Sequence, residues 1–461
     1  MNGKIKVLFY NLDQAGVQYF RSQTPAMELE KMYGEDFHVE FNQQIDFNDP
    51  EVIEYLKSFH IIHYHRQLHP NVNEMMKIAK ILKENGTTLI MDVDDYWYLH
   101  KKHPLYSMSI EKQMHVSIIQ NLKIADYVTT TTELFAEKIK EVTGKDNVIV
   151  LYNSIDPDIM KQFRDKWKPN DEGKVRIIYA AGSSHAADVE QLRSVMNVLY
   201  NDPELKDKFK VILAGWDTAG TTTEIKFNQD FGNELQVLGL WNQQVVNIIN
   251  KTKGDVDAIP NLPNNLKDKY RGKVFETNQR EIKSEESIYL RYEEILTDNH
   301  NIIKDKDYLE WLMNFERDVN YPGEEGNFGR RWTQKANVYA KVLDEADIVI
   351  APLEDNEFNR CKSSLKQIEC WTRKLPVVCS DIPPYNVDGK HMENCVLIPN
   401  KKNAHKYWKK YLKQLILDED LRKKLGEQLY EDFKDKYHLK TVTKKRAEFY
   451  KEVVSKVLAV K

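Results

Sequence analysis

Short apolar runs alternate with amphipathic stretches along the first third of the chain. An apolar run bounded by turn residues is typical of a buried strand, and the stretches between the runs have a helical period. One helix is expected to begin near Thr24-Pro25, where proline suits the first helical turn, and another to cover 71–84. Strands are expected at 4–10, 37–41, 59–65, 87–95, 125–132 and 147–153. This alternation predicts βαβ units and a parallel sheet.

The same pattern starts again near residue 174. Residues 174–199 are interpreted as a strand, a Gly-Ser turn and a helix, and a helix is expected over 361–373. Further strands are expected at 210–216, 346–356, 375–381 and 394–400. The two series join near 153–157, so the sequence predicts an α/β protein with two Rossmann-like, doubly wound halves.

The αβ rhythm is interrupted between the two groups of strands in the second half. Because a structureless loop of this length is implausible inside a compact domain, residues from about 217 to 335 are interpreted as an inserted, mostly helical subdomain. The expected organisation is a first domain over 1–153, a second over 154–402 containing the insertion, and C-terminal helices over 403–461 that pack back across both domains.

Composition indicates a folded, globular chain. Hydrophobic residues make up 41% and charged residues 30%, and the net charge is −4, which does not by itself indicate a nucleic-acid binder. No apolar run approaches membrane-spanning length, and the N-terminus runs directly into a strand. The cysteines at 361, 370, 379 and 395 lack any CxxC spacing, which argues against a zinc site or a disulfide framework. The sequence therefore predicts a cytoplasmic protein without a membrane partner.

The segment NRCKSSLKQIE at 359–369 has the composition of an anion site. A helix that begins near its serines would point free backbone N–H groups and its positive dipole end toward a diphosphate. The lysines add charge, the serines add hydroxyl donors, and the glutamate could accept hydrogen bonds from a ribose diol. The candidate donor-binding residues are Lys362, Ser363, Ser364, Lys366 and Glu369. The alternative is an ordinary amphipathic helix with solvated lysines.

A second candidate for the same ligand follows the first strand of the second half. Gly182 and Ser183-Ser184 are small enough for the backbone to approach a ligand closely, and a helix N-terminus follows. His185 could contact phosphate or sugar. A helix cap without any ligand would explain the serines equally well.

Acidic and basic residues end the strands of the first half. Asp94 and Asp95 follow a buried strand, where open α/β sheets place ligands. They could hold acceptor hydroxyls or act as a base, although Asp92, Asp94 and Asp95 also resemble a metal-binding DxD. Tyr19 and Arg21 lie near the first strand–helix loop and are candidate acceptor contacts, with helix packing and a surface cation as the alternative. Arg66, at the end of a strand, is a further candidate acceptor contact.

The histidines at 60, 63, 65 and 69 form a cluster in the sequence. His63 and His65 share one face of a strand, as zinc ligands can, but no cysteine or carboxylate stands at a familiar metal spacing. No GxSxG elbow, Walker loop or full GxGxxG pattern is present, which disfavours hydrolase, NTPase and dehydrogenase functions.

Several segments, in this order, resemble the family-4-type GT-B glycosyltransferases, especially those encoded by bacteriophages. They are 16–29, 87–104, 125–139 with 147–156, 346–385, and the tail at 410–429. The resemblance implies a GT-B fold, in which two Rossmann-like domains face a cleft. It further implies that the first domain binds an acceptor, that the second binds a nucleotide-sugar co-substrate, expected to be a UDP-sugar, and that neither a permanent cofactor nor a metal is required.

The resemblance also implies a mechanism. The departing diphosphate is expected to be stabilised electrostatically by Lys362, Ser363 and helix N-termini, with His185 nearby. The family typically retains the anomeric configuration, whereas inversion would need Asp94 or Asp95 as a base. The chain departs from the family at one point: Glu369 matches the second glutamate of the usual donor motif, but Cys361 stands where the first belongs.

Phage-type relatives of this fold include enzymes that add glucose or arabinose to hydroxylated cytosine in DNA. Hydroxylated cytosine is therefore the favoured acceptor, with KDKYRGK at 267–273 and Arg330, Arg331 and Trp332 as candidate phosphate and stacking contacts. A hydroxyl on a saccharide, lipid-linked glycan or protein is the enzymatic alternative. A non-catalytic GT-B scaffold, for which Cys361 is the best support, is the other alternative.

Overall fold

The computed structural model describes residues 3–12, 16–101, 103, 105–111, 113–158, 173–216, 221–281, 287–297, 324–325, 327–336 and 339–460. The chain forms two compact units, one of Met1–Trp216 with Ile288–Lys461 and the other of Asp217–Ser287.

The first half of the larger unit contains a parallel sheet with the strand order β2-β1-β3-β4-β5-β6. Its strands are β1 (Ile5–Tyr10), β2 (Phe37–Asn42), β3 (Ile61–His65), β4 (Thr88–Asp92), β5 (Tyr127–Thr130) and β6 (Val148–Val150). Helices α2 (Thr24–Tyr33), α3 (Val52–Lys57), α4 (Val72–Asn85), α5 (Met114–Ile124) and α6 (Glu133–Thr143) connect them. Strands β3 and β4 are buried along their whole length, as expected for a sheet covered on both faces.

The second half contains a sheet with the order β11-β12-β8-β7-β13-β14-β15. Its strands are β7 (Val175–Ala180), β8 (Phe209–Trp216), β11 (Glu324–Glu325), β12 (Phe328–Trp332), β13 (Ile348–Ala351), β14 (Val377–Ser380) and β15 (Val396–Ile398). All pairings are parallel except that of β11 with β12. The strands predicted from the two series of apolar runs are therefore present, and each series forms its own sheet.

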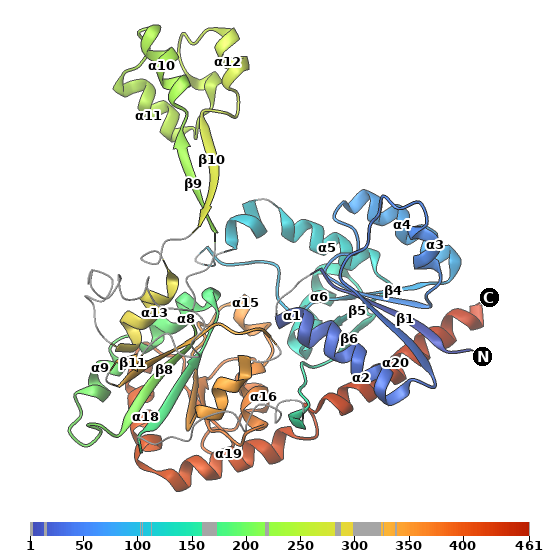
Figure 1. The fold of residues 1–461 in the computed structure, drawn as a ribbon, viewed down its shortest axis with the longest axis vertical. Helices are drawn as coiled ribbons and strands as arrows, with labels where there is room; N and C mark the ends of the chain where they lie inside the picture. Colours follow the sequence, from blue (N-terminus) through green and yellow to red (C-terminus); the bar gives the residue numbers. More distant parts are fainter. Residues whose placement is uncertain are drawn as a thin grey trace. The chain divides into compact units, whose positions relative to one another are not determined.

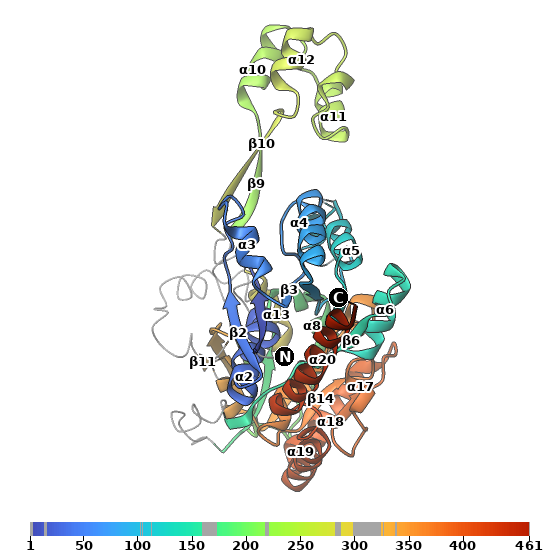
Figure 2. The ribbon, with the colours of Figure 1, turned by 90° about the vertical axis from the view of Figure 1, so that its right-hand side faces the viewer.

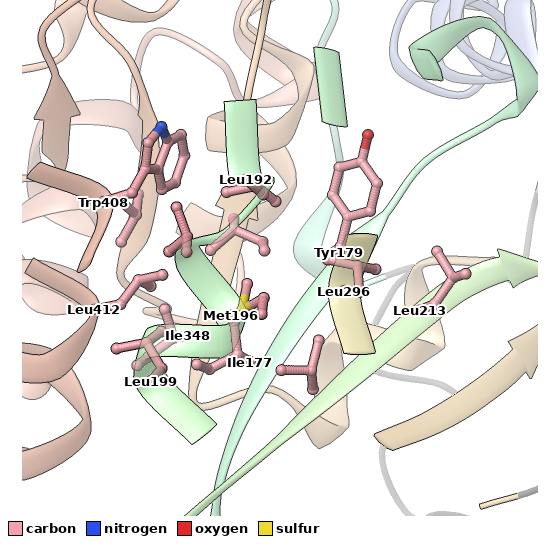
Figure 3. Packing of buried hydrophobic residues seen from close by; sticks show 14 of the residues in the cluster. Ile177, Tyr179, Leu192, Met196, Leu199, Leu213, Leu296, Ile348, Trp408 and Leu412 are labelled. Carbon is pink, nitrogen blue, oxygen red and sulfur yellow. The ribbon is translucent and has the colours of Figure 1, made fainter. Parts of the chain in front are cut away.

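A large apolar cluster fills the space between the second sheet and the helices on one of its faces. Figure 3 shows Met196 and Leu199 of α9 (Val195–Tyr200) beside Ile177 and Ile348 of the sheet. Trp408 and Leu412 of α18 (Ala404–Leu417) complete the same cluster. Truncating such fully buried side chains costs about 2–5 kcal/mol each, so this face fixes α18 to the second half.

The C-terminal helices connect the two halves of the larger unit. Helix α19 (Glu419–Phe433) packs against α16 (Leu365–Trp371) of the second half. Helix α20 (Leu439–Val460) lies beside α2 (Figures 1 and 2). Its Tyr450 and Val453 are buried with Phe9 of the first sheet. No described helix is both long enough and apolar enough to span a membrane.

The smaller unit is a helical cluster on a two-stranded ribbon (Figure 1). Strands β9 (Thr221–Phe227) and β10 (Phe275–Glu281) pair antiparallel, and helices α10 (Gln229–Val237), α11 (Gln243–Lys251) and α12 (Asn264–Tyr270) lie between them in sequence. A core that includes Phe231, Leu235, Ile249 and Tyr270 holds the helices together.

The compact insertion ends at Ser287 rather than near 335. Helix α13 (Ile288–Thr297) buries Tyr292 and Leu296 in the core of the second half, and β12 pairs with β8. The sequence obscured this because β12 reads FGRRW, and two consecutive arginines are atypical of a buried strand.

In both sheets, the order in which successive strands are added reverses at one place. In the first, β1 lies between β2 and β3, and in the second, β7 lies between β8 and β13. Open α/β sheets bind ligands beyond the carboxyl ends of the strands at such a switch point. The loops that follow β1, β7 and β13 are therefore the places to look for a site.

Candidate functional site

A cavity of about 940 Å³ lies where these loops meet. Its lining from the first half includes Gly16, Val17, Phe20, Arg21, Asp94, Asp95 and Asn153. Its lining from the second half includes Gly182, Ser184, His185, Gly215, Leu353, Lys362, Ser363, Lys366 and Tyr385. The volume is that of a site for a nucleotide-sized ligand.

The predicted donor segment forms one wall of this cavity. Lys362, Ser363 and Lys366 all line it, while Ser364 is buried at the start of α16 and does not. The Lys362 ammonium lies 4.8 Å from the centre of the Phe358 ring. Ser363 Oγ accepts a hydrogen bond of 2.8 Å from Asn153 Nδ2, which joins this wall to the end of the first half.

Glu369 lies behind that wall rather than in it. Its carboxylate is fully buried, and Lys366 Nζ donates a 2.9 Å hydrogen bond to Oε2. Burial raises the pKa of Glu369 to about 8 and lowers the pKa of Lys366 to about 8. Glu369 is therefore outside the lining and is connected to it through Lys366, and its contact with a ribose diol stays a prediction.

Cys361 is also outside the cavity lining. It is 2% exposed and packs with Phe358 in the apolar cluster of the first half. An apolar contact between the two halves therefore stands at the position where the sequence resemblance would place the first motif glutamate.

The predicted Gly-Ser turn lies on the same wall. Gly182 and Ser184 line the cavity, whereas Ser183 is exposed and outside the lining. A methyl group at Gly182 would meet nothing within 4 Å. His185 also lines the cavity, and its Nδ1 bonds to Asp188 Oδ2 at 2.7 Å.

The two aspartates that follow β4 have different surroundings. Asp94 Oδ1 accepts hydrogen bonds from His65 Nε2 at 3.0 Å and from Arg66 Nη2 at 3.1 Å. Burial works to raise the pKa of Asp94, but His65 and then Arg66 outweigh it and hold that pKa well below its usual value. Asp95 is 39% exposed. Desolvation of its carboxyl group, and then the negative charge of Asp94, raise the pKa of Asp95. Both carboxylates line the cavity.

Arg21 is a structural residue at the edge of the cavity. Its guanidinium binds both oxygens of Asp92, at 2.6 and 3.0 Å, and donates to the Leu151 carbonyl at 2.6 Å and to Asn153 Oδ1 at 3.1 Å. Arg21 is 1% exposed and Asp92 is 2% exposed. Because all these donors are engaged, the expected acceptor contact is replaced by an internal clamp. Both carboxylate oxygens of Asp92 are thus engaged by Arg21.

The remaining acceptor candidates of the first half lie outside the lining. Tyr19 packs edge-on against Phe20, with ring centres 5.2 Å apart. Arg66 has a left-handed backbone, with φ of 58°, and its guanidinium is directed to Asp94. It can therefore affect the cavity through Asp94.

The arginines of β12 are internal. Arg330 pairs with Glu293, and the two side chains are 1% and 0% exposed. Arg330 is therefore not available to a DNA phosphate, contrary to the prediction from the sequence. Arg331 Nη2 lies 2.6 Å from Glu345 Oε2, although Arg331 and Trp332 do line the cavity. Within the smaller unit, Arg271 pairs with Asp257 and Lys269 with Glu234.

The histidine cluster does not assemble into a site. His60 Nδ1 accepts from the Lys6 N–H at 3.0 Å, and His69 Nδ1 accepts from the Asn71 N–H at 3.0 Å. His63 is buried, and burial lowers its pKa to about 3. Among the described residues, no three histidine, cysteine or acidic side chains are grouped to hold a metal ion.

Sequence reasoning missed several residues of the lining, including Asn153, Gly215, Tyr289, Lys341 and Tyr385. Asn153 and Tyr385 lie in segments that carry the sequence resemblance, and each follows a strand. These two features were the signal that could have identified them as lining residues. Gly215 has φ of +93°, and an added Cβ would lie 2.8 Å from the Ala181 carbonyl oxygen. That constraint arises between β7 and β8 and has no local sequence signature.

Replacing Gly215 with alanine is expected to lower the free energy of unfolding by about 1–3 kcal/mol, because the side chain meets both strain at positive φ and a backbone oxygen. The matched control is Gly182→Ala, where φ is −84° and space is open, so a change within about 0.5 kcal/mol is expected. Urea unfolding followed by circular dichroism measures both. Equal midpoints would contradict the strain argument.

No protein-family model and no curated protein matches this chain. Solved structures do match it. A glycosyltransferase from Rickettsia africae aligns over 98% of this chain and 99% of its own, with 12% identity and a TM-score of 0.52. Sucrose-phosphate synthase from Thermosynechococcus elongatus aligns over 98% and 100%, with 9% identity and a TM-score of 0.55. HepE from Anabaena, solved with UDP and glucose, aligns over 96% and 99%, with 11% identity and a TM-score of 0.53.

These likenesses extend over almost the full length of the chains compared. At such identities they establish the fold, and the GT-B architecture expected from the sequence is confirmed.

Proposed function

We propose that this protein is a glycosyltransferase that moves a sugar from a nucleotide-diphosphate sugar, a UDP-sugar, to an acceptor hydroxyl. The observation that carries the proposal is the cavity between the two sheets, with Lys362, Ser363 and Lys366 on one wall and Asp94 and Asp95 on the other. One wall offers cations and a hydroxyl to a diphosphate, and the other offers acceptors to a hydroxyl nucleophile. The solved complex of HepE with UDP-glucose supports this choice of donor.

In the proposed reaction, the bond between the anomeric carbon and the β-phosphate oxygen breaks, and its electron pair stays on that oxygen. Lys362 and Ser363 stabilise the charge that develops there, which lowers the barrier only because they are already in position. The acceptor oxygen forms the new bond to the anomeric carbon, and its proton passes to the departing β-phosphate oxygen. Because Lys362 and Lys366 offset the negative charge of the diphosphate and Ser363 can donate a hydrogen bond to it, no metal is required in this proposal, and turnover should survive EDTA.

We propose retention of configuration, as the resemblance implies. In the inverting alternative, Asp95 is the better base of the two aspartates. Its pKa is raised and its side chain is exposed to the cavity, whereas Asp94 is held by His65 and Arg66 and has a lowered pKa. Proton NMR of the product's anomeric signal distinguishes the two outcomes.

The acceptor stays a prediction from the sequence. Hydroxylated cytosine in DNA loses one expected contact, because Arg330 is buried against Glu293. Within the smaller unit, the basic residues Lys269 and Arg271 are paired with carboxylates at its surface. A hydroxyl on a saccharide, lipid-linked glycan or protein remains the alternative acceptor.

The test is a transfer assay read by mass spectrometry. The protein is incubated with pooled nucleotide sugars and DNA containing hydroxymethylcytosine, with and without EDTA, and the digested nucleosides are weighed. A nucleoside heavier by one hexose or pentose, formed equally in EDTA, is the expected result. Consumption of a nucleotide sugar without that product would keep the glycosyltransferase and reject the DNA acceptor. If no nucleotide sugar is consumed or bound, the proposed function is wrong.

A further inference from the structure

Asp188 occupies a central position behind the donor wall. This carboxylate, 4% exposed, follows the loop after β7. Its Oδ2 bonds to His185 Nδ1 at 2.7 Å. Its Oδ1 accepts the backbone N–H of Glu354 at 2.7 Å and Asn359 Nδ2 at 2.9 Å. Three segments of the second half, those after β7, after β13 and before the donor helix, thus converge on one side chain.

The protonation of His185 follows from this arrangement. Burial works to raise the pKa of Asp188, but its bonds to His185 and its other donors outweigh burial and hold it below its usual value. An ionised carboxylate can only accept hydrogen bonds, so His185 Nδ1 must carry a proton and donate it. In the neutral ring, Nε2 then carries only a lone pair and acts as an acceptor. It can donate to a phosphate oxygen only after the ring has taken up a second proton, on Nε2.

The charges around His185 determine when that second proton binds. Burial and then the positive charge of Lys362 hold the pKa of His185 below its usual value. Asp188 acts in the opposite direction, Lys366 adds to the repulsion, and His103 also interacts with the ring. A diphosphate bound beside the two lysines would offset their repulsion and favour the imidazolium, which is the usual effect of a nearby opposite charge.

We propose that Asp188 is a positioning residue that orients His185 so that the ring binds the donor diphosphate as an imidazolium, and that donor binding is therefore coupled to the uptake of one proton. The inference rests on the proposed function, because it assigns the cavity to a nucleotide-diphosphate sugar. It adds a proton-linked contact, from a residue pair outside the donor segment, to the lysines and serine already described.

Calorimetric titration with UDP-glucose, without acceptor, tests the coupling. UDP-glucose has no group that titrates near neutral pH, so the proton count obtained from buffers of different ionisation enthalpy belongs to the protein. At pH 6.5 we expect uptake of about 0.5–1 proton, and between pH 5.5 and 7 a fall in affinity of up to about tenfold per pH unit. Lys366, with its pKa lowered to about 8, stays protonated in this window.

His185→Gln is the first variant, since glutamine keeps a hydrogen-bonding side chain but cannot titrate. It should bind UDP-glucose more weakly at pH 5.5, without proton uptake and without pH dependence. Uptake in this variant equal to that of the unmodified protein would overturn the assignment to His185.

Asp188→Asn tests the positioning role, with Asn359→Ala as its matched control. Asn359 Nδ2 donates to Oδ1 of the same carboxylate, whereas His185 bonds to Oδ2. We expect Asp188→Asn to reduce proton uptake and Asn359→Ala to leave it unchanged. If both variants only weaken binding equally at every pH, Asp188 is merely structural and the inference fails.

The two proposals fail in different ways. If the unmodified protein binds UDP-glucose without proton uptake, this inference is wrong and the glycosyltransferase stands. If it binds no UDP-glucose at all, the UDP-sugar assignment and this inference are both overturned.

Discussion

Replacing Lys362 with alanine is expected to reduce sugar transfer by about 10²–10³-fold while leaving the protein folded, a loss typical of removing one preorganised group that stabilises developing charge. Lys362 is half-buried in the cavity wall and contacts the Phe358 ring. In the part of the chain that the structure describes, no carboxylate forms an ion pair with it, so its charge is available to a diphosphate. Steady-state kinetics with the donor identified by the transfer assay measures the loss.

Lys410→Ala is the matched control for this variant. Lys410 is an exposed residue of α18 whose ammonium lies 4.8 Å from the Tyr411 ring, so its replacement removes a similar cation–π contact outside the cavity lining. Its turnover should equal that of the unmodified protein. Lys362→Arg, which keeps the charge, should recover part of the activity. If Lys362→Ala has the normal turnover rate and unfolds at the same thermal midpoint as the unmodified protein, the diphosphate site is wrongly assigned.

Replacing Arg21 with alanine is expected to lower the free energy of unfolding by about 3–5 kcal/mol, because it leaves the Asp92 carboxylate buried without its cation. The lost contacts include both bonds to Asp92 and the bond to the Leu151 carbonyl. Chemical denaturation gives the change. The control is Lys451→Ala, which breaks a 2.7 Å pair with Asp36 at 46% and 50% exposure and should cost about 0–1 kcal/mol.

The effect of Arg21→Ala should also depend on pH. In the unmodified protein, burial works to raise the pKa of Asp92, but Arg21 outweighs it and holds that pKa low. The stability from this pair is thus present above the unfolded pKa of aspartate and is lost only in acid. Without Arg21, the folded protein gains a proton on Asp92 or His63 that the unfolded chain does not hold at neutral pH. Its stability should therefore fall as pH rises from about 5 to 8, whereas a flat profile would contradict the buried-pair argument.

Much of the fold follows from the pattern of apolar runs along the chain. In a parallel sheet covered on both faces, each strand must be apolar along its length, so runs such as 59–65 and 87–95 could be located without tertiary information. Because ligands bind beyond the carboxyl ends of such strands, the sequence also pointed to Lys362, His185 and Asp95, which the structure brings into one cavity.

The sequence did not reveal which residues pair with the buried charges. Arg21 was predicted to contact a ligand, because an arginine beside a strand–helix loop has the same appearance in the sequence whether its guanidinium meets a ligand or an aspartate 71 positions away. Arg330 looked like a DNA contact, and only the packing of α13 onto β12 places Glu293 against it.

The details of the donor wall arise from contacts between segments that are distant in the sequence. Glu369 was correctly placed on its helix, yet the fold buries it behind Lys366. Asp188 attracted no attention in the sequence, although three segments converge on it. The physical reason is common to these cases: apolar burial is recorded locally in the period of the sequence, whereas an ion pair or hydrogen bond forms between residues that only the completed fold brings together.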